Sequence, residues 1–321
     1  MQNLKIDDWL IPPNAANKLW FQDRGRALEQ ILCQMLLNEG MEPEINIRPK
    51  GEEIDGSFFL DSRVFLIEAK WHSKPIVASH IYAFRGKVDG KLIGTIGFFF
   101  SMSDYSSQAI DAVMRGKEIN IILFSSDDIH LIDQKMISMR KALLAKLRFA
   151  TEYGQPFYSL RTHLAKVNLK NKGIDATLAM NFIIESEQDA RTLECLLSRF
   201  HMHKQYTIIP SGSEKATFAL SHNLIKSSHD NVTVIFQGVV DDKLKRKTNK
   251  LKALGVHIIN LPQSLENWLE NYLTVDEINS LFFASSHNGK MARRFAQRAD
   301  LKKLLSDNPD LNEIISEMSR K

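Results

Sequence analysis

The spacing of apolar residues in the first part of the chain predicts short helices and strands in a definite order. Apolar residues recur every three or four positions over Gly25–Leu37, which predicts an amphipathic helix. Three strand-like runs follow, with a tight turn at Asp61 and Ser62 between the last two: Glu44–Arg48, Glu53–Leu60 and Arg63–Trp71. Helices and strands then alternate: Pro75–Lys87 (helix), Thr95–Ser101 (strand), Asp104–Arg115 (helix) and Asn120–Phe124 (strand). This order predicts an α/β domain over residues 1–135.

The second part of the chain alternates strands and helices more regularly. A basic, mostly helical connector is predicted over residues 136–175, and a second α/β domain over residues 176–263. Helical segments separate its four expected strands: Leu178–Glu185, Tyr206–Pro210, Val232–Gln237 and Val256–Leu261. Such alternation favours parallel pairing in a doubly wound sheet. Residues 264–321 are predicted to be a helical tail, in which Thr274 and Glu277 have the spacing of a capping box.

The composition is that of an ordinary globular protein, with 44% apolar and 25% charged residues. It excludes a disordered, collagen-like or disulfide-rich chain. The two cysteines, Cys33 and Cys195, are far apart in sequence, which fits a reducing compartment. No apolar run approaches the roughly 20 residues that span a bilayer. We therefore expect a cytoplasmic protein that has no membrane partner.

The net charge of +4 is small, but the cations are clustered. The stretch from Lys135 to Lys172 contains nine Lys and Arg residues but only one acidic residue, and Lys243–Lys252 contains six more cations. Clusters of this kind neutralise phosphates and release counterions. The candidate nucleic-acid contacts in the second cluster are Lys243, Lys245, Arg246, Lys247 and Lys250. A solvated helix face is an equally good interpretation of the pattern.

The residues with the most informative chemistry are Asp55, Glu68 and Lys70. Glu68 and Lys70 are two apart on one strand and project to one face, and a short hairpin brings Asp55 beside them. Two carboxylates and the Ala69 carbonyl can hold Mg²⁺ or Mn²⁺, while Lys70 orients or deprotonates the attacking water and stabilises developing charge. An ion pair on an exposed hairpin is the alternative. The apolar run Val64–Ile67 argues against it, because it predicts a buried strand.

This arrangement resembles the PD-(D/E)XK nuclease superfamily, and within it the Mrr-like restriction endonucleases, over about Asp23–Phe124. Glu29 matches the helical glutamate that often assists metal binding in that family, and Gly97–Ser101 followed by Ala109 also fits. Ile54 replaces the family's proline before the first aspartate.

The resemblance implies a restriction-endonuclease-like mixed sheet flanked by helices. It also implies a metal-dependent endonuclease that hydrolyses DNA phosphodiester bonds in restriction or anti-phage defence. Double-stranded DNA would be the substrate. A homodimer would cut both strands, and another protein of a defence system is a candidate partner.

Glu185 and Asp189 form a second candidate site. Their order along the chain is similar to a TOPRIM domain, in which a Glu-Gly-x-x-Asp turn and a later Asp-x-Asp pair bind magnesium. Ser186 replaces the glycine here, and no Asp-x-Asp follows the strand that ends at Gln237. We therefore expect an inactive TOPRIM-like domain with a vestigial metal site. Acids that only stabilise a helix N-terminus explain the pair equally well.

Two function classes besides an active nuclease stay open. One is a nucleic-acid-binding or ligand-sensing regulatory protein whose nuclease fold is gated by a partner. The other is a primase-type or topoisomerase-type enzyme that uses the TOPRIM-like domain. The missing Asp-x-Asp pair disfavours the second class.

Overall fold

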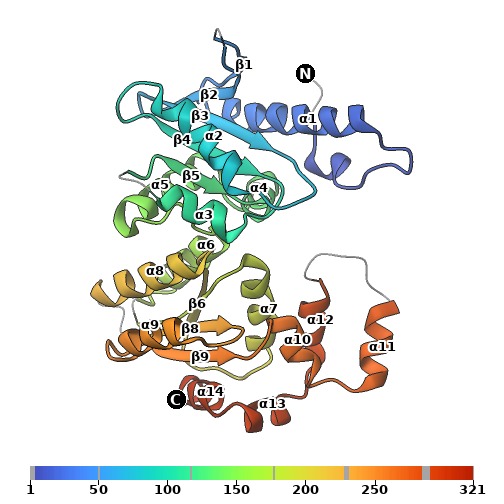
Figure 1. The fold of residues 1–321 in the computed structure, drawn as a ribbon, viewed down its shortest axis with the longest axis vertical. Coiled ribbons are helices and arrows are strands. Elements are labelled where there is room, and N and C mark those ends of the chain that lie inside the picture. The colour runs from blue at the N-terminus through green and yellow to red at the C-terminus, as the bar shows by residue number, and fades with distance from the viewer. Residues whose placement is uncertain are drawn as a thin grey trace. The chain divides into compact units, whose positions relative to one another are not determined.

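The computed structural model describes residues 4–49, 51–115, 118–175, 178–227, 231–283 and 290–320. The chain divides into two compact units, Met1–His163 and Leu164–Lys321 (Figure 1). The division falls inside the predicted connector 136–175. Positions 1, 176 and 321, at which predicted domain boundaries fall, lie outside the described residues.

Unit 1 contains a five-stranded sheet between helices. Its elements are η1 (Ile6–Trp9), α1 (Lys18–Leu37), β1 (Glu44–Ile47), β2 (Ile54–Leu60), β3 (Arg63–Lys70), α2 (Ala78–Asp89), β4 (Ile96–Ser101), α3 (Ser107–Met114), β5 (Ile121–Phe124), α4 (Ser126–Asp133) and α5 (Met139–Tyr153). The strand order is β1-β2-β3-β4-β5. The first three strands pair antiparallel and the last three pair parallel. The expected mixed sheet flanked by helices is therefore confirmed.

Three predicted helices begin at other residues than expected. Helix α3 begins at Ser107 rather than Asp104, because the Ser106 side chain caps it. Helix α1 begins at Lys18, seven residues before Gly25, because the Asn17 side chain accepts a hydrogen bond from the backbone of Trp20 and caps the helix. Helix α2 begins at Ala78 rather than Pro75. Ile76 forms a parallel bridge with Tyr105 instead. The residues just before α2 are therefore extended and pair with the segment that leads into α3.

Close packing of α2 on the sheet holds one face of unit 1 together. Phe84 and Val88 of α2 are fully buried against β4. A Cβ atom added to Gly97 would lie 2.5 Å from the Phe84 ring and 2.7 Å from Val88. Only glycine leaves room there, so helix α2 is seated rigidly over the strands that carry the candidate site.

A buried ion pair holds the other side of unit 1. Lys146 of α5 and Asp128 of α4 are 2.6 Å apart, and both side chains are fully buried. The Lys146 ammonium also donates to the carbonyls of Leu123 and Tyr158, at 2.8 and 2.5 Å. Asp128 accepts from the backbone N–H of Leu160 at 2.8 Å. The pair thus connects two helices, a strand and a loop, with its polar atoms satisfied.

Unit 2 is built on a four-stranded parallel sheet. Helix α6 (Leu160–Asn171) leads into it, and the elements that follow are β6 (Met180–Ile184), α7 (Glu187–Leu197), β7 (Tyr206–Pro210), α8 (Glu214–Lys226), β8 (Val232–Gln237), α9 (Asp242–Lys252), β9 (His257–Leu261), α10 (Leu265–Glu270), α11 (Val275–Phe283), α12 (Lys290–Arg298), α13 (Leu301–Asp307) and α14 (Pro309–Ser319). The strand order is β7-β6-β8-β9, and every pair is parallel. The predicted parallel pairing is confirmed.

The helices after residue 264 contribute directly to the core of unit 2. Trp268, Phe295 and Leu304 pack with Phe182 of β6 in one buried cluster. The predicted capping box is confirmed, because Thr274 and Glu277 exchange hydrogen bonds between side chain and backbone. Within the described ranges, no helix combines the length and the apolar character that a membrane crossing requires.

Candidate active site

The candidate site lies where the β2–β3 ladder ends. The last paired residues are Gly56 and Ile67. Beyond them, the Asp55 carboxylate accepts a hydrogen bond from the backbone N–H of Ala69, at 2.9 Å. The C=O of a strand residue points to the same side as its N–H, so the Ala69 carbonyl also faces this end of the ladder. The local geometry fixes Asp55 across from the end of β3.

Asp55, Glu68 and Lys70 come together as the sequence predicts. The Lys70 Nζ atom is 3.0 Å from Asp55 Oδ2 and 2.7 Å from Glu68 Oε1. The two carboxylate side chains are only 11% and 8% exposed, and that of Lys70 is 27% exposed. An ion pair on an exposed hairpin does not describe this arrangement. It is a pair of buried carboxylates that share one ammonium group.

The expected burial of Val64–Ile67 holds for three of its four residues. Phe65, Leu66 and Ile67 are buried, whereas Val64 is 48% exposed. Val64 pairs with Phe59 close to the hairpin turn, and Phe59 is likewise 47% exposed, so this pair lies at the exposed end of the hairpin. The buried part of β3 is therefore the part that leads into the site.

The charges around Lys70 determine its protonation state. Burial by itself lowers the pKa of Lys70, but the carboxylates of Glu68 and Asp55 outweigh this effect and raise the pKa above its ordinary value. The amine is therefore positively charged at neutral pH. In this state it donates hydrogen bonds and carries no free electron pair.

Lys87, which the sequence analysis did not select, belongs to the same cluster. Its Nζ atom is 2.7 Å from Glu68 Oε2, so a different ammonium group binds each oxygen of Glu68. Lys87 follows the buried residue Phe84 by three positions on α2, and i and i+3 side chains share a helix face. One signal in the sequence could have identified Lys87. It is a cation next to the apolar face of the helix that follows β3.

Glu29 lies on α1, close enough for the charge of Asp55 to affect it. Burial, then the charge of Asp55, raise the pKa of Glu29 to about 7; Lys70 opposes this shift, and Glu53 adds to it by less than Lys70 removes. A group that titrates near neutral pH is a common feature of functional sites. Glu29 nevertheless does not complete a metal cage. Across the described ranges, no group of three or more His, Cys, Asp or Glu side chains could hold a metal ion.

The raised pKa of Glu29 predicts a pH-dependent stability of the metal-free protein. Between pH of about 4.5 and about 7 the folded chain holds a proton that the unfolded chain has lost. The free energy of unfolding therefore falls as the pH rises through this window, and above it the contribution of Glu29 no longer changes with pH. We expect Glu29→Gln to remove this fall, measured by urea denaturation with EDTA. Glu44→Gln, at an exposed position of β1, is the control. Equal slopes for wild type and Glu29→Gln would contradict the prediction.

Arg24 connects α1 to the end of β3. Its guanidinium lies 4.9–5.2 Å from the ring centroids of Trp20, Phe21 and Trp71 and donates to the Trp71 carbonyl. Trp71 directly follows Lys70. The contact therefore holds the helix that carries Glu29 against the strand that carries Glu68 and Lys70.

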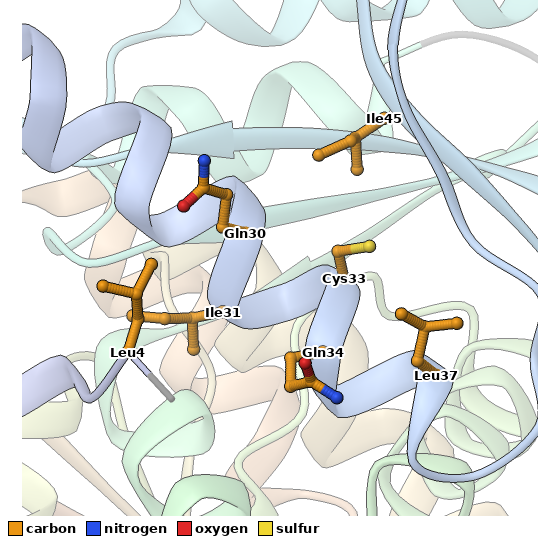
Figure 2. Close-up of a pocket in the computed structure, with 7 residues that line it drawn as sticks. All are labelled: Leu4, Gln30, Ile31, Cys33, Gln34, Leu37 and Ile45. Carbon is orange, nitrogen blue, oxygen red and sulfur yellow. The ribbon is translucent and has the colours of Figure 1, made fainter. Parts of the chain in front are cut away.

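A pocket of about 360 Å³ lies elsewhere on α1 (Figure 2). It is lined by Leu4, Gln30, Ile31, Cys33, Gln34, Leu37 and Ile45. None of these is a candidate catalytic residue. Burial raises the pKa of the Cys33 thiol, which keeps it protonated and a poor nucleophile. We assign this pocket no part in the chemistry.

In unit 2, Glu185 and Asp189 lie at the carboxyl end of β6. Ser186 is the N-cap of α7, and its hydroxyl accepts from the Asp189 backbone N–H and donates to the Asp189 carboxylate. Burial, then the charges of Glu270 and Asp189, raise the pKa of Glu266 on α10. The structure therefore brings an acid near Asp189 that the sequence analysis did not identify. The capping bonds of Asp189 account for its position at the helix N-terminus.

The predicted nucleic-acid contacts lie on α9. Lys243, Lys245, Arg246 and Lys250 are exposed there. Lys247 differs from them: it binds Glu214 at 2.8 Å and lies 4.8 Å from the centroid of the Phe218 ring. Most of these cations are therefore oriented toward solvent.

One of the comparisons with known proteins, that with protein families, agrees with the geometry of unit 1. Residues 23–132, about a third of the chain, match the family model Mrr_cat, described as a restriction endonuclease. A solved structure titled "Crystal Structure of Protein of Unknown Function AF1548" is 15% identical, with a TM-score of 0.25. That match covers 71% of this chain and 96% of the other. No curated protein matches the chain. The TOPRIM-like assignment of unit 2 stays a prediction, whereas residues 23–132 are similar to the restriction endonucleases of the Mrr type.

Proposed function

We propose that the protein is a metal-dependent endonuclease that hydrolyses phosphodiester bonds of double-stranded DNA in restriction or anti-phage defence. Asp55, Glu68 and Lys70 are its catalytic residues, and Glu29 assists them. The observation that carries the proposal is the meeting of two buried carboxylates around one ammonium group at the end of β3. The match of residues 23–132 to restriction endonucleases supports the reaction class.

The donor atoms fit Mg²⁺ or Mn²⁺. One cation, the Lys70 ammonium, already bridges Asp55 and Glu68, so their oxygens are spaced to share a cation. The Ala69 carbonyl at the same end of the ladder adds a third oxygen, and hard oxygen ligands are those that these ions prefer. When bound, the ion supplies Lewis-acid stabilisation of the phosphate and lowers the pKa of water.

The residues of the chain divide the remaining tasks. Asp55 and Glu68 hold the ion, and the backbone N–H of Ala69 fixes Asp55 for this role. Lys70 has a raised pKa and is therefore protonated. This favours a role in which its ammonium group orients the attacking water and stabilises the charge that develops on the phosphate, rather than one in which it removes a proton.

The direct test exposes the purified protein to duplex DNA, single-stranded DNA and RNA, each with Mg²⁺, Mn²⁺ or EDTA. We expect cleavage of duplex DNA with either metal and none with EDTA. Cleavage that persists in EDTA would contradict the metal dependence. Preferential cleavage of RNA or single strands would contradict the substrate class. Absence of cleavage with every substrate and metal would favour the gated regulatory protein.

A homodimer is part of the proposal, because one site of this kind cuts one strand of a duplex. Light scattering of the protein bound to a short duplex measures the stoichiometry. Two copies per duplex, together with linear product from a plasmid, are expected. One copy per duplex with nicked circles as the final product would contradict the dimer.

The exposed cations of α9 predict salt-dependent DNA affinity. We expect Lys245→Glu combined with Arg246→Glu to weaken binding and to reduce the slope of log affinity against log salt by about 1 for each lost phosphate contact. Fluorescence anisotropy with a labelled duplex measures both quantities. Lys215→Glu combined with Lys226→Glu, at two exposed positions of α8, makes the same change of −4 in net charge and is the control. An equal effect of both variants would show that α9 makes no specific contact.

A further inference from the structure

We propose that Lys87 is a positioning residue of this site: it occupies Glu68 Oε2, so that only Oε1, the oxygen next to Lys70 and Asp55, is presented to the metal ion, and its charge limits metal affinity. The inference rests on the proposed nuclease function and extends it to a residue outside the Asp-Glu-Lys cluster that the sequence analysis selected.

The geometry around Glu68 is the first observation. Lys70 binds Oε1 and Lys87 binds Oε2, each at 2.7 Å, and the Glu68 side chain is 8% exposed. The two lysines come from different elements, β3 and α2. Glu68 is therefore held from two sides, and its orientation depends on a helix as well as on its own strand.

The rigidity of α2 is the second observation. Phe84 and Val88, on either side of Lys87 in the sequence, are fully buried against β4. Gly97 leaves no space for these side chains to move inward, because even a Cβ atom there would clash with both. The backbone that carries Lys87 is thus fixed relative to β4. Through its ion pair, Lys87 in turn fixes the position of the Glu68 carboxylate.

The charges predict the direction of the effect. The cluster holds two buried carboxylates and two ammonium groups, from Asp55, Glu68, Lys70 and Lys87. Without Lys87, the site is one unit more negative and Glu68 Oε2 loses its ammonium partner, so both oxygens of this carboxylate can take part in binding a cation. A divalent ion should then bind more tightly, in a less suitable geometry, and cleavage should slow. A residue needed only for folding would slow cleavage without tightening the binding of the ion.

The chain offers a matched control four residues later. Lys91 binds Glu52 at 2.5 Å in an ion pair whose lysine is 30% exposed, against 22% for Lys87. That pair involves no residue of the catalytic cluster. Lys91→Met therefore removes a comparable lysine–glutamate contact close to the same helix and leaves Glu68 untouched.

The experiment compares wild type with Lys87→Met, Lys87→Arg and Lys91→Met. Calorimetric titration with Mn²⁺ in the absence of DNA gives metal affinity, and single-turnover cleavage at saturating Mn²⁺ gives the rate. We expect Lys87→Met to bind Mn²⁺ several-fold more tightly and to cleave about 10- to 100-fold more slowly. Lys87→Arg keeps the charge and should restore both quantities in large part. Lys91→Met should behave as wild type.

Three results would overturn the proposal: unchanged metal affinity in Lys87→Met, weaker affinity, or equal defects in Lys87→Met and Lys87→Arg. If Lys87→Met does not fold, Lys87→Gln replaces it in the experiment. This variant keeps a hydrogen-bond donor but removes the charge, and its affinity for Mn²⁺ tests the expected tightening. A wild-type protein that binds Mn²⁺ but cleaves no nucleic acid contradicts the nuclease function alone. The comparison of affinities still decides the role of Lys87.

Discussion

Lys70→Ala abolishes metal-dependent cleavage, with an expected loss of at least about 10²–10³-fold in rate. The physical reason is that, among the residues that the structure describes, Lys70 alone contacts both carboxylates, which are 11% and 8% exposed. Its removal takes away the donor that orients water and stabilises charge, and leaves Asp55 without its ion pair. Single-turnover cleavage of a plasmid with Mg²⁺ measures the loss.

The control for this prediction is Lys5→Ala, an exposed lysine before η1. It should cleave at the wild-type rate. Circular dichroism spectra of Lys70→Ala and wild type should coincide in Mg²⁺, which separates loss of chemistry from loss of fold. Wild-type activity in a folded Lys70→Ala variant would refute the assignment of the active site.

Lys146→Met destabilises unit 1 by about 3–5 kcal/mol, the usual cost of a buried charge left without its partner. Asp128 would stay fully buried and lose its counterion at 2.6 Å. The carbonyls of Leu123 and Tyr158 would lose a donor in the same step. Urea denaturation followed by tryptophan fluorescence measures the free energy of unfolding.

The matched control is Arg148→Met on the same helix. Arg148 and Glu152 form an exposed ion pair four residues apart, and such pairs contribute about 0.3–0.5 kcal/mol. The variant should therefore unfold almost as wild type does. If Lys146→Met cost no more than Arg148→Met, the buried pair would contribute no net stability to the fold.

The candidate catalytic cluster was predictable because its contacts are local. Asp55, Glu68 and Lys70 lie within sixteen residues, on two strands joined by a tight turn at Asp61 and Ser62, both of which have positive φ. Alternation along β3 places Glu68 and Lys70 on one face, and a two-residue turn fixes the register that brings Asp55 across. Few other arrangements of these strands are possible.

The contribution of Lys87 was not predictable in the same way. It depends on how closely α2 packs on β4, which is set by the absence of a side chain at Gly97. The start of α2 was misplaced for a related reason, because Ile76 pairs with Tyr105, a residue on another part of the chain. Proline and apolar spacing at Pro75–Lys87 carry no information about that partner.

The titration of Glu29 and the pairing of Lys146 with Asp128 are also tertiary properties. The pKa of Glu29 and the ion pair of Lys146 both depend on burial by elements that are distant in sequence. The spacing of apolar residues does not indicate which charged side chains the fold buries. Lys146 belonged to a basic cluster in the sequence, where a solvated lysine is the usual interpretation. The fold places it in the core instead.

By itself, the sequence determined the element order, the mixed and parallel character of the two sheets, and the group of Asp55, Glu68 and Lys70. These follow from periodicity and short-range turns, which act between residues close in the chain. Only the tertiary structure decided which cations hold Glu68, which lysine is buried with an aspartate, and why Glu29 titrates near neutral pH. The reason is that desolvation and close packing depend on the surroundings of a side chain, and distant segments supply most of those surroundings.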